Sequence, residues 1–220
     1  MYELKSGVAV LELAMPPEDA ETCLDAARAM YASVEARRAY PPATAAEREL
    51  RVSIDLWGGM RLFDLIAFCR DNRIVDGIAL IAGALSLAAG KIAWEHSFVR
   101  RLTPEKPAGV SWHCDAEAAS TMLLPDWERY ISLWVPLVPV GVDGSPSLEV
   151  IVGSNAVMRA ETLTPKEHRD AAWVDQFGLD RLCPQLNPGG VAAFDQLTLH
   201  RTQQARVDCE RITMEVRFIP

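Results

Sequence analysis

The first 90 residues of the chain carry a helical pattern of apolar and polar positions. Pro17 is followed by two acidic residues, and proline and acidic side chains both favour the first turn of a helix. A Tyr-Pro-Pro segment at 40–42 should end this helix. Two more helices are predicted over 60–69 and 74–88, the latter apolar nearly all round and therefore buried. The first helix is defined by apolar residues at the helical spacing, namely Ala20, Leu24, Ala27, Tyr31 and Val34.

From residue 91 onward the pattern changes to short apolar or alternating stretches that are typical of strands. Turn-forming residues separate them, most clearly at 141–146 and 187–190. The more polar 155–181 segment predicts a long excursion, partly helical over 164–174. Helices followed by many short strands favour an α+β fold, mainly β, with helices covering one face of a β sandwich or barrel. The expected strands are 91–102, 110–113, 130–136, 147–152, 191–194 and 211–219.

The last expected strand alternates strictly between apolar and polar residues. Side chains two positions apart in a strand point to the same face, so the apolar residues lie on one face of this strand and the polar residues on the other. One interpretation is a half-exposed strand whose charged side chains lie in water. The other is that the apolar face packs under the N-terminal helices while the polar face lines a barrel. The apolar face consists of Ile212, Met214, Val216 and Phe218, and the polar face of Arg211, Thr213, Glu215 and Arg217.

Composition and charge narrow the classes of partner. A length of 220 residues suits one domain. The net charge is −8 and no run of basic residues occurs, which argues against binding to nucleic acid or to anionic lipids. The longest uncharged stretch, 77–90, has 14 residues, whereas a helix that crosses a bilayer needs about 20.

Cysteine usage and the N-terminal residues favour a soluble, cytoplasmic protein. The five cysteines are odd in number, scattered, and form no Cys-x-x-Cys pair, which argues against a disulfide framework and against a thiolate zinc site. The first residues lack the basic region and apolar core of a secretory signal peptide. The oligomeric state stays open.

Two of the four histidines stand in positions that suit metal binding. His113 and Asp115 form a His-x-Asp pair at the end of a short expected strand, so imidazole and carboxylate point to one face. Two histidines and one carboxylate are the ligands of a non-haem Fe(II) facial triad. An isolated His-x-Asp is more often a surface pair near a turn. His200, which lies 87 residues further on, can supply the second imidazole and favours the metal hypothesis.

Three side chains near the C-terminus suit the binding of one carboxylate. The guanidinium of Arg211 matches a carboxylate in a bidentate way, and Thr213 lies two residues along the same face. Thr202 follows His200 by two residues and should share its face, which places another hydroxyl beside the proposed metal.

These residues give the chain a resemblance to a known family. From about residue 91 to the C-terminus it resembles the Fe(II)- and 2-oxoglutarate-dependent oxygenases, and among them the phytanoyl-CoA dioxygenase-like group. The resemblance rests on the order and spacing of several short motifs. They are His113-Cys114-Asp115, Leu-Trp-Val-Pro-Leu at 133–137, Ser-Leu-Glu-Val-Ile-Val-Gly-Ser at 147–154, a Gly-Gly turn at 189–190, Leu199-His200-Arg201, and Arg211-x-Thr213.

The resemblance implies a double-stranded β-helix (jelly roll) flanked by N-terminal helices. The whole chain, 1–220, would be a single domain, with 1–90 as mostly helical support and 91–220 as the jelly-roll core. Fe(II) would be held by His113, Asp115 and His200. The cosubstrate 2-oxoglutarate would chelate the iron, and O2 would be the oxidant.

The same resemblance assigns the cosubstrate pocket and the reaction. The far carboxylate of 2-oxoglutarate would pair with Arg211, helped by Thr202 or Thr213, and Trp134 would wall the pocket. Succinate and CO2 would be coproducts of the oxidation. Halogenating relatives have a small residue in place of the carboxylate, so the presence of Asp115 favours hydroxylation.

The substrate is expected to be a small soluble metabolite or natural-product intermediate, because a chain of this size has little room to clasp a larger one. His96 and Arg100 are candidates for substrate contact, although structural roles are more common for such residues. Two alternatives remain. A cupin-like metalloenzyme that does not use 2-oxoglutarate would not turn Arg211 toward the metal. A non-catalytic jelly-roll binding protein would hold His113 and His200 more than about 10 Å apart, far beyond the reach of shared metal bonds.

Overall fold

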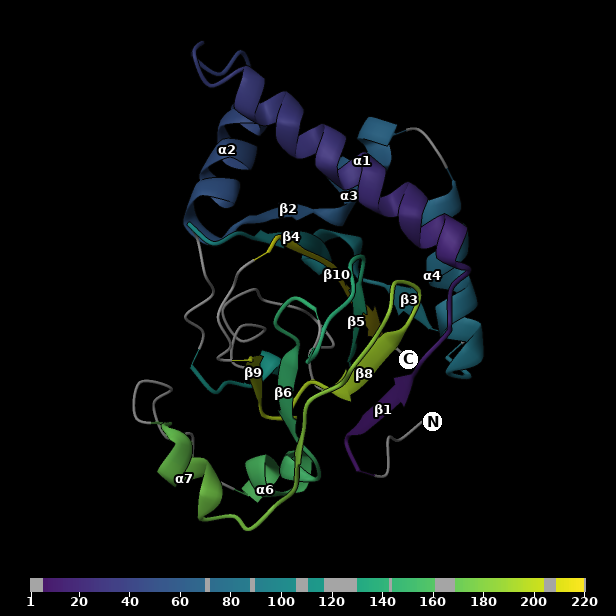
Figure 1. The fold of residues 1–220 in the computed structure, drawn as a ribbon, viewed down its shortest axis with the longest axis vertical. Helices are drawn as coiled ribbons and strands as arrows, with labels where there is room; N and C mark the ends of the chain where they lie inside the picture. The colour runs from purple at the N-terminus through teal and green to yellow at the C-terminus, as the bar shows by residue number, and fades with distance from the viewer. Residues whose placement is uncertain are drawn as a thin grey trace.

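The structure, a computed structural model, consists of a large and a small antiparallel sheet with helices packed around them (Figure 1). It describes residues 6–69, 72–87, 90–105, 111–116, 130–142, 144–160, 169–203 and 209–219. This mixture of helices and antiparallel sheet confirms the expected α+β character. The described strands do not close into a barrel.

The large sheet has seven strands, and the longest of them, β10, lies at its centre. Every pairing in it is antiparallel, and Thr213 of β10 lies between Arg100 on one neighbour and Pro136 on the other. The strand β3 pairs with β10 beside the main path. The order along the main path is β1 (Val8–Leu11), β8 (Val191–Asp195), β5 (Ile131–Pro136), β10 (Arg211–Ile219), β4 (Phe98–Leu102) and β2 (Gly59–Arg61), with β3 spanning Lys91–Ile92.

The small sheet contains β7 (Arg181–Leu182), β6 (Leu148–Ile151) and β9 (His200–Thr202) in that order. The backbone of His113 extends this sheet by one bridge to His200. The amide of His113 donates to the carbonyl of His200 over 3.1 Å, and the reverse bond is 2.9 Å long. Residues that are 87 positions apart in the chain are therefore neighbours.

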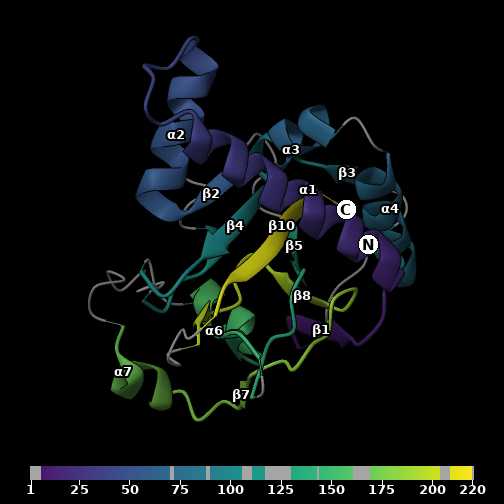
Figure 2. The same cartoon turned by 45° about the horizontal axis from the view of Figure 1, so that its top comes forward.

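Helices cover the outer face of the large sheet. They are α1 (Pro17–Ala36), α3 (Leu62–Cys69) and α4 (Arg73–Ala84), and Figure 2 shows α1 crossing over β10 and β5. The main apolar core lies between these helices and the sheet, and it includes the four apolar residues of β10. The opposite, polar face of β10 is also buried. The packing of the apolar face under the N-terminal helices is therefore confirmed, and the polar face is buried as well, although the described strands form no closed barrel for it to line.

Two helices lie on the other side of the molecule, beyond the small sheet (Figures 1 and 2). The helix α6 spans Ser154–Ala160 and α7 spans Ala171–Asp175. Within the expected helical stretch at 164–174, the described part is helical only from Ala171, and 161–168 lie outside the described residues. The expected strand at 110–113 begins outside the described residues and appears as the single bridge at His113.

The helix α2 (Ala45–Trp57) was not predicted from its sequence. It begins at Thr44, whose hydroxyl accepts a hydrogen bond from the amide of Glu47, while the Glu47 carboxylate accepts one from the amide of Ala43. This arrangement resembles a capping box, except that the carboxylate binds the amide one residue before the N-cap. Gly58, with φ of +72°, ends the helix in the left-handed conformation that glycine favours.

The prediction of one continuous strand over 91–102 is wrong. The 3-10 turn η1 (Trp94–His96) interrupts it between β3 and β4. The turn is stabilised at Ser97, whose hydroxyl donates to the carbonyl of Ala93 over 2.8 Å. The rule that residues two positions apart in a strand share a face therefore does not apply across Trp94, His96 and Phe98.

None of the helices in the described ranges combines the length and the hydropathy needed to span a bilayer.

Candidate metal centre

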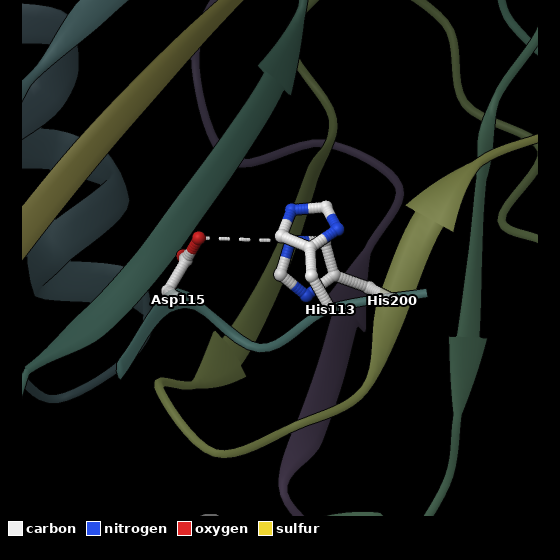
Figure 3. Close-up of side chains that lie close together, drawn as sticks. All are labelled: His113, Asp115 and His200. Atoms are coloured by element: carbon white, nitrogen blue, oxygen red, sulfur yellow. Dashed lines mark ion pairs between the residues drawn. The ribbon is translucent and has the colours of Figure 1, made fainter. Parts of the chain in front are cut away.

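His113, Asp115 and His200 converge between the two sheets (Figure 3). One possible ligand atom from each residue lies within 4.8 Å of the other two. The imidazole rings have their centroids 4.3 Å apart, and Nε2 of His200 lies 3.7 Å from an oxygen of Asp115. The hypothesis of a non-catalytic binding protein predicted well-separated histidines, and this prediction is wrong.

Backbone pairing brings the two rings together, and backbone carbonyls orient them. The bridge between His113 and His200 fixes their Cα atoms as direct cross-strand neighbours. Nδ1 of His113 lies 2.9 Å from the carbonyl of Ser111, and Nδ1 of His200 lies 2.9 Å from that of Thr198. A carbonyl oxygen can only accept, so each Nδ1 carries a proton, and Nε2 is then the ring nitrogen that a neutral imidazole offers to a metal. This is the arrangement that imidazole ligands of metals use.

Asp115 is buried and held at both oxygens. The Ser132 hydroxyl donates to one oxygen, and Nη2 of Arg217 lies 3.1 Å from the other. Burial alone would raise the pKa of Asp115, but the positive charge of Arg217 and the two neighbouring imidazoles outweigh burial and lower the pKa to about 2. The carboxylate is therefore ionised at neutral pH.

His200 is neutral at the same pH. Burial, together with the neighbouring ring of His113, lowers the pKa of His200 to about 4. The centre thus presents the Nε2 lone pair of His200 and one charged carboxylate beside the ring of His113. Two imidazoles and one carboxylate are the donor set of the facial triad, which leaves positions on the metal open to other ligands. The residues fit a divalent metal such as Fe(II).

Arg211 lies deep between the sheets, with only 1% of its surface exposed. Its Nη1 donates to the carbonyl of Pro146 over 2.9 Å and its Nη2 to the hydroxyl of Thr202 over 3.4 Å. The guanidinium carbon lies 5.7 Å from the centre of the Trp134 ring. Burial, helped by the nearby charge of Arg100, lowers the pKa of Arg211 to about 9. The side chain still carries its positive charge at neutral pH.

Several polar atoms around Arg211 lack hydrogen-bond partners in the described part of the chain. They are Nε of Arg211 itself, the hydroxyl of Thr213 and Nε1 of Trp134. Within the same ranges, no carboxylate forms an ion pair with Arg211. Buried donors normally have partners, and a buried cation normally has an anion. This cluster therefore fits an anionic ligand supplied from outside the chain.

The sequence-predicted residues thus form two groups. His113, Asp115 and His200 make the metal centre, whereas Arg211, Thr202, Thr213 and Trp134 lie together around a candidate anion site. Thr202 connects the groups, because it shares strand β9 with His200.

The two candidates for substrate contact have different surroundings. Nε of Arg100, on β4, lies 3.6 Å from a carboxylate oxygen of Glu215. His96, on η1, lines a pocket at the edge of the large sheet.

Arg217 and Ser132, the two side chains that hold Asp115, were missed in the sequence. Alternation along β10 placed Arg217 on the same face as Arg211 and was the available signal for it. The guanidinium of Arg217 lies over the rings of Phe98 and Tyr130, at 5.4 Å and 5.8 Å. Burial would lower its pKa, but the charges of Asp115 and Glu215 raise it above the usual value. No sequence pattern pointed to Ser132.

Solved structures with the same fold include enzymes that are named as α-ketoglutarate-dependent, α-ketoglutarate being another name for 2-oxoglutarate. The α-ketoglutarate-dependent carbocyclase SnoK and the epimerase SnoN, both from nogalamycin biosynthesis, match with TM-scores of 0.62 and 0.59 at 16% and 17% identity. Each match covers 98% of this chain, and 80% and 78% of the respective enzymes. EctD from S. alaskensis, solved with 2-oxoglutarate and 5-hydroxyectoine, matches with a TM-score of 0.62 at 17% identity over 98% of this chain and 72% of its own.

The chain shares the fold of these non-haem enzymes. No protein-family model matches the sequence, and a search of curated protein sequences finds no match. The comparison therefore establishes the architecture, and the chemistry has to be argued from the residues of the chain.

Ser132 offers a test of the metal centre that changes no charge. We expect Ser132→Ala to weaken Fe(II) binding about tenfold, because partners that orient a metal ligand typically contribute that much affinity. The measurement is anaerobic calorimetric titration with Fe(II). Ser53→Ala is the matched control, since it removes a hydroxyl that donates to the carbonyl of Gly59 over 2.8 Å, away from the centre. Equal Fe(II) affinities of the two variants would show that Ser132 does not orient the ligand.

Proposed function

We propose that the chain is an Fe(II)- and 2-oxoglutarate-dependent dioxygenase that hydroxylates a small soluble metabolite or natural-product intermediate. The observation that carries the proposal is a metal-binding triad next to a buried arginine without a carboxylate partner among the described residues. One ligand satisfies both features, because 2-oxoglutarate has a keto acid at one end to chelate a metal and a carboxylate at the other. The shared fold of α-ketoglutarate-dependent enzymes supports this choice.

In this proposal the architecture is a double-stranded β-helix. The two facing antiparallel sheets and the site between them agree with it. Residues 1–220 form a single oxygenase domain, in which 1–90 support the 91–220 core. Two further parts of the proposal rest on the sequence alone. They are membership of the phytanoyl-CoA dioxygenase-like group, from the resemblance of the motifs, and a cytoplasmic location.

His113, Asp115 and His200 would hold Fe(II). When bound together with 2-oxoglutarate, the iron supplies the activation of O2 that oxidises a substrate C–H bond, with succinate and CO2 as coproducts. The metal and cosubstrate carry the difficult chemistry, and the protein contributes binding, orientation and a dry pocket.

The residues around Arg211 would bind the cosubstrate. Its guanidinium neutralises the far carboxylate, and the free Nε completes a bidentate contact. The hydroxyl of Thr213, which has no partner in the described ranges, adds a third donor. The indole of Trp134 covers the guanidinium and keeps water away from the ion pair.

The partners of Asp115 would fix the position of the carboxylate that binds the iron. With Ser132 on one oxygen and Arg217 beside the other, the carboxylate cannot rotate freely. Hydroxylation is the proposed outcome because Asp115 supplies a carboxylate at the position where halogenating relatives have a small residue. SnoK and SnoN, named as a carbocyclase and an epimerase, show that the fold also supports other outcomes.

The direct test is turnover of 2-oxoglutarate without a known substrate. We expect the wild-type chain to form succinate from 2-oxoglutarate in air with Fe(II) and ascorbate, at a low rate that stops when either Fe(II) or 2-oxoglutarate is withheld. Succinate is measured by chromatography with mass detection. Fe(II) binding is measured separately under nitrogen. A protein that binds no iron and forms no succinate would overturn the proposal, and one that binds iron but ignores 2-oxoglutarate would instead favour the cupin-like alternative.

A further inference from the structure

A pocket of about 340 Å³ opens at the edge of the large sheet, between α2, α3, η1 and β4. Leu50 and Phe98 give it apolar walls, and His96 stands beside them. All three side chains are half-buried, so each is shielded by the protein and accessible from the pocket. We call this cavity the His96 pocket.

Two side chains, Phe98 and Arg217, connect the His96 pocket to the candidate metal centre. The ring of Phe98 forms part of its wall and also packs against the guanidinium of Arg217, whose carbon is 5.4 Å from the ring centre. Arg217 in turn lies 3.1 Å from Asp115. A molecule that contacts Phe98 from the pocket is therefore separated from Asp115 by the side chain of Arg217.

The rim of the pocket carries uncompensated negative charge. Glu49 and Glu95 line it, and within the described ranges neither carboxylate forms an ion pair. Asp64 also lines the pocket, but it is paired with Arg61 over 2.9 Å, so these two charges cancel. The pair and the two glutamates together leave the rim with a net charge of about −2, if all the carboxylates are ionised.

The sign of the charge therefore differs between the two sides of Phe98. The rim is negative, whereas the guanidinium of Arg217 is positive at the inner side of Phe98. A molecule with a cationic end would be oriented with that end at the rim and with its neutral or anionic part toward the metal. The apolar walls between the two suit a hydrocarbon or aromatic frame.

We propose that the His96 pocket is the substrate subsite and that it selects molecules carrying an ammonium-type cation on an apolar or aromatic frame. The role of the pocket as a substrate subsite rests on the proposed function. The recognition itself depends only on residues of the chain that lie outside the metal centre.

The test uses benzylammonium as the probe, on the full chain without added metal. Nuclear magnetic resonance of histidine, with the His96 signals assigned from a His96→Gln variant, reports binding at the pocket. We expect saturable shifts of the His96 signals with benzylammonium, weaker shifts with neutral benzyl alcohol, and none with benzoate. Added salt should weaken the binding of the cation, because the carboxylates are exposed.

The variant Glu49→Gln/Glu95→Gln should weaken benzylammonium binding about fivefold, as expected for the loss of two exposed charge contacts. The matched control is Glu12→Gln/Glu21→Gln, which makes the same change in net charge at exposed positions outside the pocket. Equal loss in both variants would overturn the inference, and so would equal binding of benzylammonium and benzyl alcohol or the absence of saturable binding.

The two proposals fail in different ways. Probe binding needs neither iron nor 2-oxoglutarate, so a chain that forms no succinate can still show the cation-selective pocket. A chain that forms succinate but does not discriminate benzylammonium from benzyl alcohol would keep the proposed function and lose this subsite.

Discussion

Replacing His113 with alanine should remove Fe(II) binding and succinate formation together. The imidazole would supply one of the three ligands, and the contact of its Nδ1 with the carbonyl of Ser111 orients the ring. Changes to residues that merely orient a ligand cost about 10- to 100-fold in metal affinity, so loss of the ligand itself should cost at least about 100-fold. Anaerobic titration with Fe(II) and the succinate assay measure the two effects.

The variant should keep its fold, because the bonds between His113 and His200 are made by backbone atoms. Cys114→Ala is the matched control. Cys114 lies between the two ligands in sequence but packs into an apolar cluster with Trp112 and Leu199. Its truncation should lower the free energy of unfolding by about 1 kcal/mol and leave Fe(II) binding intact. Succinate formation by His113→Ala at the wild-type rate would exclude His113 as a ligand.

The candidate ligands could be found in the sequence because their geometry is largely local. His113 and Asp115 lie two residues apart, so they stay close in space, although Asp115 is helical in the structure and the rule that such residues share a strand face does not apply to it. The contribution of His200 required a long-range pairing, which the resemblance in motif order supplied. The contacts of Asp115 with Ser132 and Arg217 could not be predicted in this way, because they depend on the register of β5 against β10, where these two residues lie opposite each other.

The fold was predictable where one element carries a long periodic pattern. The first helix and β10 each bury one face, and their apolar residues recur at the helical or the strand period. The short strands β1, β2 and β7 have two to four residues, too few for an alternation to be recognised. They exist because neighbouring strands pair with them.

The helix α2 and the turn η1 show two further limits of the pattern. The apolar and polar residues of α2 are well separated around the helix, so this stripe and the capping residues Thr44 and Glu47 were both available signals for it. In η1, a local side-chain bond from Ser97 competes with the strand ladder. Both elements contribute residues to the wall of the His96 pocket, and these residues face the pocket and are not fully buried in the apolar core.

Replacing Arg211 with methionine should raise the 2-oxoglutarate concentration needed for half-maximal succinate formation by at least about 100-fold. A bidentate contact of a guanidinium with a carboxylate contains two charge-assisted hydrogen bonds of roughly 1.5–3 kcal/mol each, which corresponds to that factor or more. Methionine has a similar length and removes a buried charge, so the variant should still fold. Fe(II) affinity should change less than about threefold, because the arginine touches Thr202 and none of the three ligands.

Arg211→Lys separates charge from geometry at the same position. An ammonium keeps the positive charge but cannot make the two parallel bonds of a guanidinium, so its 2-oxoglutarate requirement should lie between those of the wild type and Arg211→Met. A structural arginine would behave differently. Its loss would disturb the carbonyl of Pro146 and the hydroxyl of Thr202, and through strand β9 it would weaken Fe(II) and 2-oxoglutarate binding to the same extent. The ratio of the two losses therefore decides whether the unpartnered donors beside Arg211 await a cosubstrate or serve only the packing of the two sheets.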